Sequence, residues 1–205
     1  MYRSTPTGAL ALVAFVCSAP LAAQGVRAQL GIGGSLALPM GFYHAEPTSG
    51  DGFTPALHGL MLVDLKLPNS PIGFRFDAST GHNPANDSLK THLSAAVGAP
   101  TDAKTTLLGV NAGVTYNLQP ASAVRGYLLA GIGFHHVKIT ETSNGFSVDT
   151  SATKFAWNVG VGLTVGTGAI AGFIEARYVD VAAFVGLKPT FFATTTGIRL
   201  AIGGQ

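Results

Sequence analysis

The chain has 205 residues, of which 11% are charged and 47% are hydrophobic, with 27 glycines and a formal net charge of +2. A soluble globular domain typically carries roughly 25% charged residues, so this composition excludes an ordinary water-facing surface and favours either a protein that spans a membrane or a poorly soluble structural protein. The length suits one domain or one small membrane barrel. The near-neutral charge gives no reason to expect nucleic acid as a partner.

The amino-terminal segment has the three parts of a secretory signal peptide. Arg3 supplies a positive charge, residues 9–16 form an apolar stretch, and Ala23 ends a small-residue cleavage site. A second cleavage site ends at Ala28, so the sequence leaves the position of cleavage open. The apolar stretch is shorter than the ~20 residues that a membrane-spanning helix needs. We therefore expect residues 1–23 to be a signal peptide that directs export.

Strand-like runs recur along the rest of the chain. The most apolar stretch, residues 159–174, contains five glycines between β-branched residues, which argues against a spanning helix. In chain order the predicted strands are Gln29–Phe42, Ala56–Leu67, Ile72–Ser79, Thr105–Leu118, Arg125–Thr140, Thr153–Val165, Ile170–Tyr178 and Phe191–Ile202.

The run Lys154–Val165, KFAWNVGVGLTV, alternates bulky apolar residues with small or polar ones. A period of two predicts a β-strand, because successive side chains point to opposite faces. A face of glycine, asparagine and threonine is unsuited to a soluble surface and suits the narrow interior of a small barrel. The bulky face then contacts lipid. In this run and in Ile72–Ser79 we expect the lipid-facing residues to be Phe74, Phe76, Phe155, Trp157, Val159, Val161 and Leu163.

Charged residues within the runs fall mostly on the face opposite the bulky apolar one. A charge on the lipid side would cost on the order of 2–4 kcal/mol near the middle of the membrane. Both signs occur in similar numbers, so we predict an ion-pair network that fills a narrow eight-stranded lumen; a conducting or proton-relay lumen is the alternative. The expected members are Asp64, Lys66, Arg75, Asp77, Lys154, Glu175, Arg177 and Arg199.

Aromatic residues lie near the ends of several runs. Girdles at the two membrane interfaces would explain these positions, since such rings suit the headgroup zone; ordinary core packing is the alternative. In Arg125–Thr140 the alternation does not decide which face is which. The residues concerned are Tyr43, Tyr116, Tyr127, Trp157, Tyr178, Phe191 and Phe192.

Long and short connections alternate between the runs. In an up-and-down barrel all long connections then fall at one rim and all short ones at the other, as in outer-membrane barrels. We therefore predict an all-β fold, a single up-and-down antiparallel transmembrane β-barrel of eight strands, that occupies residues 24–205. The short connections are Pro68–Pro71, Gln119–Ala123 and Thr167–Ala169, and the long ones are His44–Pro55, Thr80–Lys104, Glu141–Ala152 and Asp180–Thr190.

This pattern resembles the small eight-stranded outer-membrane β-barrel proteins, the OmpX-like and opacity-protein-like group. The resemblance covers residues 29–205 and includes the glycine-rich segment 126–133 and the final Thr196–Leu200. It implies a barrel in the outer membrane of a Gram-negative-type cell, with outer-membrane lipid and the barrel-assembly machinery as partners. Family members usually finish in an aromatic residue that this machinery reads, whereas this chain finishes in Ile202-Gly203-Gly204-Gln205.

The resemblance implies roles such as adhesion, surface interaction or envelope integrity. Because a closed wall and a filled, non-conducting lumen expose little else, we expect the protein to act structurally or through the connections Thr80–Lys104 and Glu141–Ala152, where an external ligand would bind. The sequence does not indicate an oligomeric state. We expect no enzyme activity, no metal and no cofactor. The only cysteine, Cys17, lies in the expected signal peptide.

Three alternatives remain open. One is a narrow passive pore. Another is a barrel enzyme that modifies lipid A, although the chain has no His-x-Ser-Asn run of the kind that the deacylases show. Its candidate groups are His44 with Glu46 and Ser49, or His82 with Asp87 and Ser88. The third is a soluble periplasmic ligand-binding barrel whose bulky faces point inward.

Overall fold

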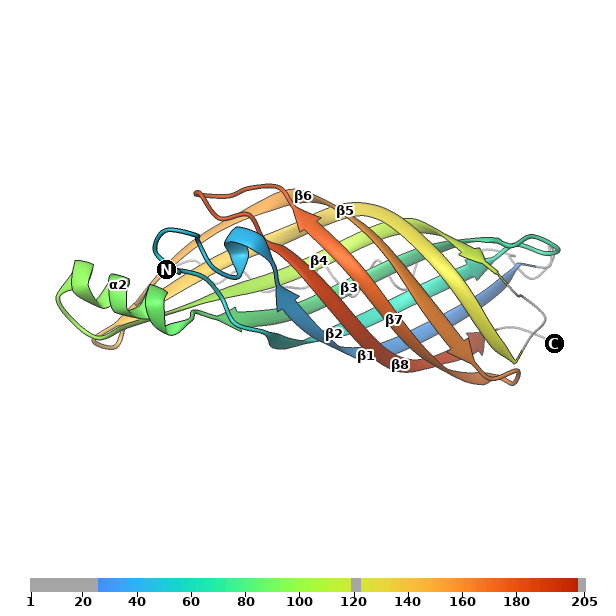
Figure 1. Cartoon of the computed structure of the whole chain (residues 1–205). Coiled ribbons are helices and arrows are strands. Elements are labelled where there is room, and N and C mark those ends of the chain that lie inside the picture. The colour runs from blue at the N-terminus through green and yellow to red at the C-terminus, as the bar shows by residue number, and fades with distance from the viewer. Residues whose placement is uncertain (1–25, 119–122, 203–205) are drawn as a thin grey trace, which may run out of the picture.

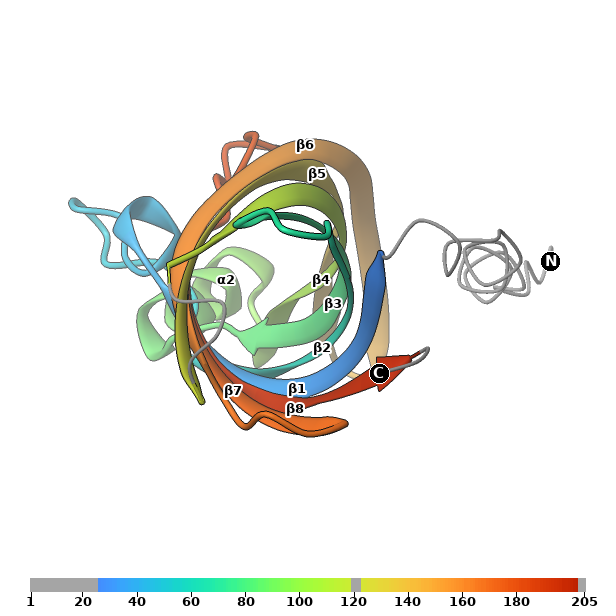
Figure 2. The same ribbon diagram turned by 90° about the vertical axis from the view of Figure 1, so that its right-hand side faces the viewer.

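Eight antiparallel strands close into a single barrel (Figure 1, Figure 2), and the computed structural model describes residues 26–118 and 123–202. Each strand pairs with the next, and β1 closes the ring by pairing with β8, where Leu30 lies opposite Leu200. The predicted all-β up-and-down fold is confirmed. The strands are β1 (Arg27–Pro39), β2 (Ala56–Lys66), β3 (Ile72–Pro84), β4 (Thr101–Asn117), β5 (Val124–Ser143), β6 (Phe146–Val165), β7 (Ile170–Val181) and β8 (Thr190–Ile202).

The expected signal peptide and most of the connection Gln119–Ala123 lie outside the described residues. No helix in the described ranges is long and apolar enough to cross a membrane.

The two ends of the barrel differ in the length of their connections. At one end, which we call the turn end, short turns follow Lys66 and Val165, and β1 begins and β8 ends there. At the other, which we call the loop end, lie the three-residue 3-10 helix η3 (Gly41–Tyr43), the helix α2 (Asp87–Val97) and the longer connections (Figure 1). The predicted division of the connections between two rims therefore matches the structure, but their lengths do not all match, because β5 and β6 are joined at the loop end by two residues only.

The alternation along each strand separates the inside of the barrel from the outside. Most side chains that are exposed on the outer wall of the strands are bulky and apolar, whereas the buried polar and charged side chains point into the lumen. In β5, where the sequence left the faces undecided, the odd-numbered positions such as Tyr127 and His135 are buried inside, and Ile132 and Phe134 are exposed outside.

The connection Thr80–Lys104 is not an open loop, which corrects the sequence prediction. Strands β3 and β4 extend into it from both sides, and α2 fills its middle. Asn86 caps the helix by accepting a hydrogen bond from the Leu89 amide at 3.0 Å, and Gly98 ends it with a φ of 73°. Both are ordinary helix boundary residues. They were overlooked because the region was expected to contain only strands and loops.

The prediction that Glu141–Ala152 is a loop is also wrong. Strands β5 and β6 continue as a hairpin to Ser143 and Phe146, and only Asn144 and Gly145 turn the chain, with φ values of 50° and 81°. An Asn-Gly pair with two positive φ angles is the usual two-residue hairpin turn. The sequence carried this signal.

At the first long connection the chain leaves the sheet earlier than predicted. Strand β1 ends at Pro39, and Gly41, with a φ of 56°, begins η3. The amide of Phe53 then donates to the carbonyl of Tyr43 at 2.9 Å, and Phe53 also pairs with Ala85 ahead of α2. These contacts join the first and second long connections into one layer over the loop end.

An apolar core fills the half of the lumen nearest the loop end. Leu89 and Leu93 of α2 pack against it from above, as do Phe184 and Leu187 of the last long connection. Burial of this apolar area stabilises the loop end without requiring precise partners. The core residues are Ala37, Tyr43, Phe53, Ala85, Ala103, Leu107, Val137, Ala156, Val179, Val181, Phe191 and Ala193.

Candidate functional site

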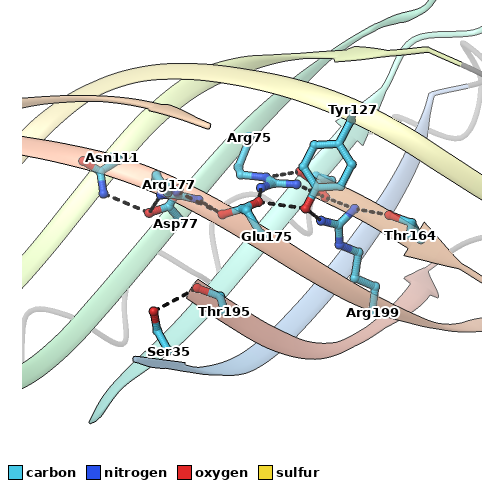
Figure 3. Close-up of polar contacts among 11 residues, drawn as sticks. Ser35, Arg75, Asp77, Asn111, Tyr127, Thr164, Glu175, Arg177, Thr195 and Arg199 are labelled. Carbon is cyan, nitrogen blue, oxygen red and sulfur yellow. Dashed lines mark hydrogen bonds and ion pairs between the residues drawn. The ribbon is translucent and has the colours of Figure 1, made fainter. Parts of the chain in front are cut away.

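The half of the lumen nearest the turn end holds a network of buried charges (Figure 3). Arg75 on β3 makes a two-pronged contact with Asp64 on β2, with Nε–Oδ1 at 2.6 Å and Nη2–Oδ2 at 3.0 Å. The same guanidinium contacts Glu175 on β7. Such bidentate pairs fix geometry as well as supplying energy.

Glu175 is the centre of this network and has no exposed surface. It accepts hydrogen bonds from Arg177 at 2.7 Å and from the hydroxyl of Tyr127 at 2.8 Å, besides its contact with Arg75. Arg177 also reaches Asp77 at 2.9 Å, and Asn111 donates to the same carboxylate at 2.8 Å. The Glu175 carboxylate therefore links residues from three strands.

Arg199 on β8 completes the network from the opposite wall (Figure 3). Its guanidinium donates to the Tyr127 hydroxyl at 2.7 Å and to the Thr164 hydroxyl at 3.0 Å, and lies 3.3 Å from Asp64. It also stacks at 4.6 Å from the centre of the Phe173 ring. Side chains of β2, β3, β5, β6, β7 and β8 thus meet across the lumen.

The network balances its own charge, since three guanidinium groups face three carboxylates. Desolvating such groups costs several kcal/mol per ion, so each needs the partners that it has. Glycine provides the room. A Cβ added at Gly162 would lie 2.2 Å from a carbon of the Tyr127 ring, so this ring occupies the space that a larger residue would fill.

Two of the eight residues expected in the network stand apart from it. Lys66 and Lys154 are half-buried, and neither forms an ion pair with another described residue. Lys66 lies at the turn end, below Asp64, and Lys154 lies near the loop end, where its ammonium sits 5.6 Å from the centre of the Phe184 ring. Both occupy inward-facing positions, as the alternation indicated, but alternation does not show where along the barrel axis a residue lies.

Sequence reasoning missed Tyr127 as a member of the network. It was expected to lie in an aromatic girdle at the membrane interface. That prediction is wrong for Tyr43, Tyr127 and Phe191, whose side chains are at most 4% exposed. The pairing of Tyr127 with Gly162, which gives the ring room inside the lumen, is visible only in the folded barrel. Tyr116, Trp157, Tyr178 and Phe192 do reach the outer wall, where the Trp157 and Tyr178 rings lie 5.4 Å apart.

The seven residues expected to face lipid all lie on the outer wall. Their exposed fractions run from 40% for Trp157 to 55% for Val161. The full set is Phe74, Phe76, Phe155, Trp157, Val159, Val161 and Leu163.

The candidate catalytic groups do not come together. His44 and His82 are exposed, and no described hydrogen bond joins either ring to an acidic residue or a serine. Glu46 instead accepts from the Thr48 hydroxyl at 2.6 Å and the Ser49 amide at 2.7 Å. No group of three or more metal-ligating side chains occurs within residues 26–118 and 123–202.

Two other histidines lie inside the barrel. His58 contacts Asn83 at 3.0 Å, and His135, 2% exposed, has no hydrogen-bond partner on either ring nitrogen. Both rings pack edge-on to Phe191, at 5.8 and 6.4 Å between centres. They mark the boundary between the apolar core and the charged network.

One small cavity lies beside the network. A cavity bordered by Arg75, Asn111 and Asn158 has a volume of about 10 Å³ for the centre of a water molecule, which is room for about one water.

Comparison with known proteins gives a consistent result for the fold. The family model described as outer membrane protein beta-barrel domain matches residues 9–199. Neisserial surface protein A (NspA) is similar with a TM-score of 0.52 at 16% identity, over 86% of this chain and 96% of that chain. A major outer membrane protein from Thermus thermophilus is similar with a TM-score of 0.53 at 12% identity, over 85% of this chain and 99% of that chain.

At these identities the likeness to solved structures concerns the fold alone. A search of curated proteins found no match.

Proposed function

This chain belongs to the outer membrane protein beta-barrel domain family, and from that premise we propose that it is a barrel with a closed, non-conducting lumen that acts structurally or through its loop end. The protein lies in the cell outer membrane, as the resemblance implied, and is embedded in its lipid. The loop end then faces outward and the turn end faces the periplasm, following the usual asymmetry of such barrels.

The observation that carries the proposal is the continuous contact across the lumen. Arg75, Glu175, Tyr127 and Arg199 come from four strands and touch in series from wall to wall. A passing ion would have to break these contacts and leave buried charges unpaired, which costs about 3–5 kcal/mol for each broken pair. The apolar core at the loop end is a second barrier, because most of the side chains that fill it are apolar and would desolvate a passing ion.

The loop end has two features that suit a binding surface: its connections hold one another in place, and it exposes apolar side chains. The His92 ring lies 2.6 Å from the Asp51 carboxylate, and the Asn86 amide donates to the Gly50 carbonyl at 2.7 Å, so the first two long connections hold each other. The β5–β6 hairpin projects from the barrel and exposes 80% of Phe146 and 67% of Val148 near its tip. Rigid, partly apolar projections of this kind suit adhesion or binding of an external ligand.

Single-channel recording in planar bilayers tests the closed lumen. The purified protein should give no unitary conductance, and a reproducible current would support the narrow passive pore instead. The matched comparison is the double variant Arg75→Ala, Glu175→Ala, which removes both members of one contact and opens the charged layer. If this variant folds and conducts ions while the parent does not, the network is what prevents ions from passing through the lumen.

A second experiment separates an adhesive role from a structural one. A variant whose hairpin is shortened beyond the facing pair Thr140 and Asp149, with Asn144-Gly145 kept as its turn, should insert normally and keep the heat-modifiable migration of a folded barrel. In a deletion strain that carries this variant, loss of surface attachment with normal detergent resistance supports adhesion. If the strain attaches normally and regains the detergent resistance that the deletion had removed, an envelope role is supported.

We further propose that residues 1–23 are a cleaved signal peptide, that residues 24–205 form the mature barrel domain, and that the seven outer-wall residues face lipid after delivery by the barrel-assembly machinery. Mass spectrometry of the mature protein should place its first residue at Gln24, whereas a first residue at Gln29 would show that the second cleavage site is used. A mature chain that begins at Met1 would contradict the proposal.

We propose no enzyme activity, since His44 and His82 have no acidic or serine partner among the described residues. Mass spectra of lipid A should be the same with and without the gene. A mass change that disappears on mutation of His44 or His82 would favour the lipid-modifying alternative.

A further inference from the structure

Charge is distributed unevenly along the barrel axis. All ten acidic residues of the chain are described, and seven of them lie at the loop end while the other three belong to the network. The turn end holds Arg27, Lys66 and Arg125 and no acidic residue. The periplasmic mouth of the lumen is therefore a place of uncompensated positive charge.

Two of these cations face the lumen, where Arg125 is close enough to act on Lys66. Lys66 and Arg125 occupy inward-facing positions of β2 and β5 and are half-buried, and Arg27 lies opposite Lys66 in the register of β1 and β2. Arg125 lies opposite Thr164, the residue to which Arg199 donates from the far wall. The positive charges of Arg125, Arg199 and Arg75 act on Lys66, against the one negative charge of Asp64.

Two of the buried arginine donors at this end have no acceptor. The Nε groups of Arg125 and Arg199 are buried and make no hydrogen bond, although Arg199 as a whole is only 3% exposed. Arg125 uses one Nη2 donor, on the Gly166 carbonyl at 2.7 Å. Asp64, the nearest acid, is already shared between Arg75 and Arg199. Leaving charged donors unsatisfied is costly, so the arrangement favours an anion that enters from outside the chain.

We propose that the turn end of the lumen binds a phosphate-bearing anion, with Lys66 and Arg125 as its side walls, Arg199 as its floor and Arg27 at its rim. Guanidinium and ammonium donors that approach from several strands suit a group with three or four acceptor oxygens, and arginine matches phosphate in a two-pronged fashion. The floor is closed by the contact of Arg199 with Tyr127 (Figure 3), so the site opens toward the periplasm. The phosphate belongs either to a soluble anion or to a phospholipid headgroup of the inner leaflet.

The test uses the full mature barrel in nanodiscs of phosphatidylcholine, titrated with inorganic phosphate against chloride at constant ionic strength. Amide resonances of Lys66, Arg125 and Tyr127 should shift in a saturable way, and the Tm should rise with phosphate. Lys66→Gln with Arg125→Gln should weaken the apparent affinity by at least about tenfold, since each removes a charged hydrogen bond. Lys90→Gln with Lys138→Gln, which removes two cations at the loop end, should leave it unchanged.

A second arm separates the two sources of phosphate. In nanodiscs that contain phosphatidylglycerol, a headgroup ligand should shift the same resonances before any phosphate is added, and inorganic phosphate should compete with it. A soluble ligand should instead bind with the same affinity in both kinds of disc. Either result supports the site.

Two results overturn the proposal. One is the absence of a saturable response in both discs, or an equal response in the Lys66→Gln, Arg125→Gln variant. The other concerns stability without phosphate, because removing cations that repel one another should raise the Tm of this variant. A lowered Tm in a correctly migrating barrel would mean that the two cations serve the fold instead of a ligand.

Discussion

The two halves of the lumen are filled by different means. At the loop end the interior is an apolar core, built from residues such as Leu107, Val137 and Phe191 and covered by α2 and the long connections. At the turn end the interior is a network of three guanidinium groups and three carboxylates that converge on Glu175. Both halves use the same inward parity of the same strands.

A narrow barrel can therefore be filled by apolar packing or by paired charges, but the two fillings respond differently to substitution. Apolar packing is non-directional and loses stability roughly in proportion to the atoms removed. A buried network is directional, and the loss of one partner leaves another charge unpaired in a low dielectric. Point changes should therefore damage the charged half more than the apolar half, and the following predictions test that order.

The largest expected effect is at the centre of the network. Glu175→Gln preserves size but removes the charge that Arg75 and Arg177 share, so unfolding should become easier by about 3–5 kcal/mol. Urea unfolding in lipid vesicles, followed by the fluorescence of the only tryptophan, Trp157, measures the loss. Glu141→Gln, an exposed change at the loop end, is the control. Equal unfolding curves for the two variants would mean that the buried charge of Glu175 adds no stability.

In the apolar half, Leu107→Ala should cost about 2–4 kcal/mol, because the core loses methyl groups and keeps part of the cavity. Leu107 is 2% exposed, whereas its neighbour Leu108 is 49% exposed on the outer wall. Leu108→Ala is therefore a matched control and should cost much less in the same unfolding measurement. A larger loss from Leu108→Ala would mean that the assignment of inside and outside in β4 is reversed.

A smaller effect is expected at the boundary between the halves. A Cβ at Gly109 would lie 2.4 Å from the His135 ring, so Gly109→Ala should cost about 1–3 kcal/mol as the ring is displaced. Gly59→Ala adds the same methyl group where the nearest atom is 3.9 Å away, and its unfolding midpoint should stay close to that of the parent. Displacement of the ring can be followed through the imidazole resonances of His135.

The smallest effect lies outside the lumen. Hydrogen bonds from the Thr48 hydroxyl and the Ser49 amide lower the pKa of Glu46 from 4.5 to about 2. A lowered pKa means that these bonds are fully present above pH 4.5 and are lost only as the pH falls through about 2. A carboxyl NMR titration should therefore have its midpoint near 2, and Thr48→Ala should raise it. A midpoint near 4.5 in the parent would show that the bonds do not persist in solution.

Much of this architecture could be predicted from the sequence because its signals are local. The alternation in Lys154–Val165 assigned the faces of β6, and the alternating lengths of the connections predicted the two ends of the barrel. The Asn144-Gly145 turn and the Asn86 cap were also local signals, and the prediction missed them because it expected irregular loops there.

The candidate site was predictable only in part. Six of the eight expected charges do meet in the lumen, because inward parity admits them to the same space. Which of them pair, and that Tyr127 joins while Lys66 and Lys154 stand apart, depends on strands 11 to 100 residues apart in the chain.

From the chain alone, the β-structure and the face that each clear strand turns outward could be assigned. These properties follow from alternation and composition, which need no knowledge of partners. Only the tertiary structure decided the height of each side chain along the barrel axis, and with it the division into an apolar half, a neutral network and a basic mouth. The physical reason is that strand register and stagger place side chains relative to one another across the lumen, and both emerge only when β1 meets β8 and the barrel closes.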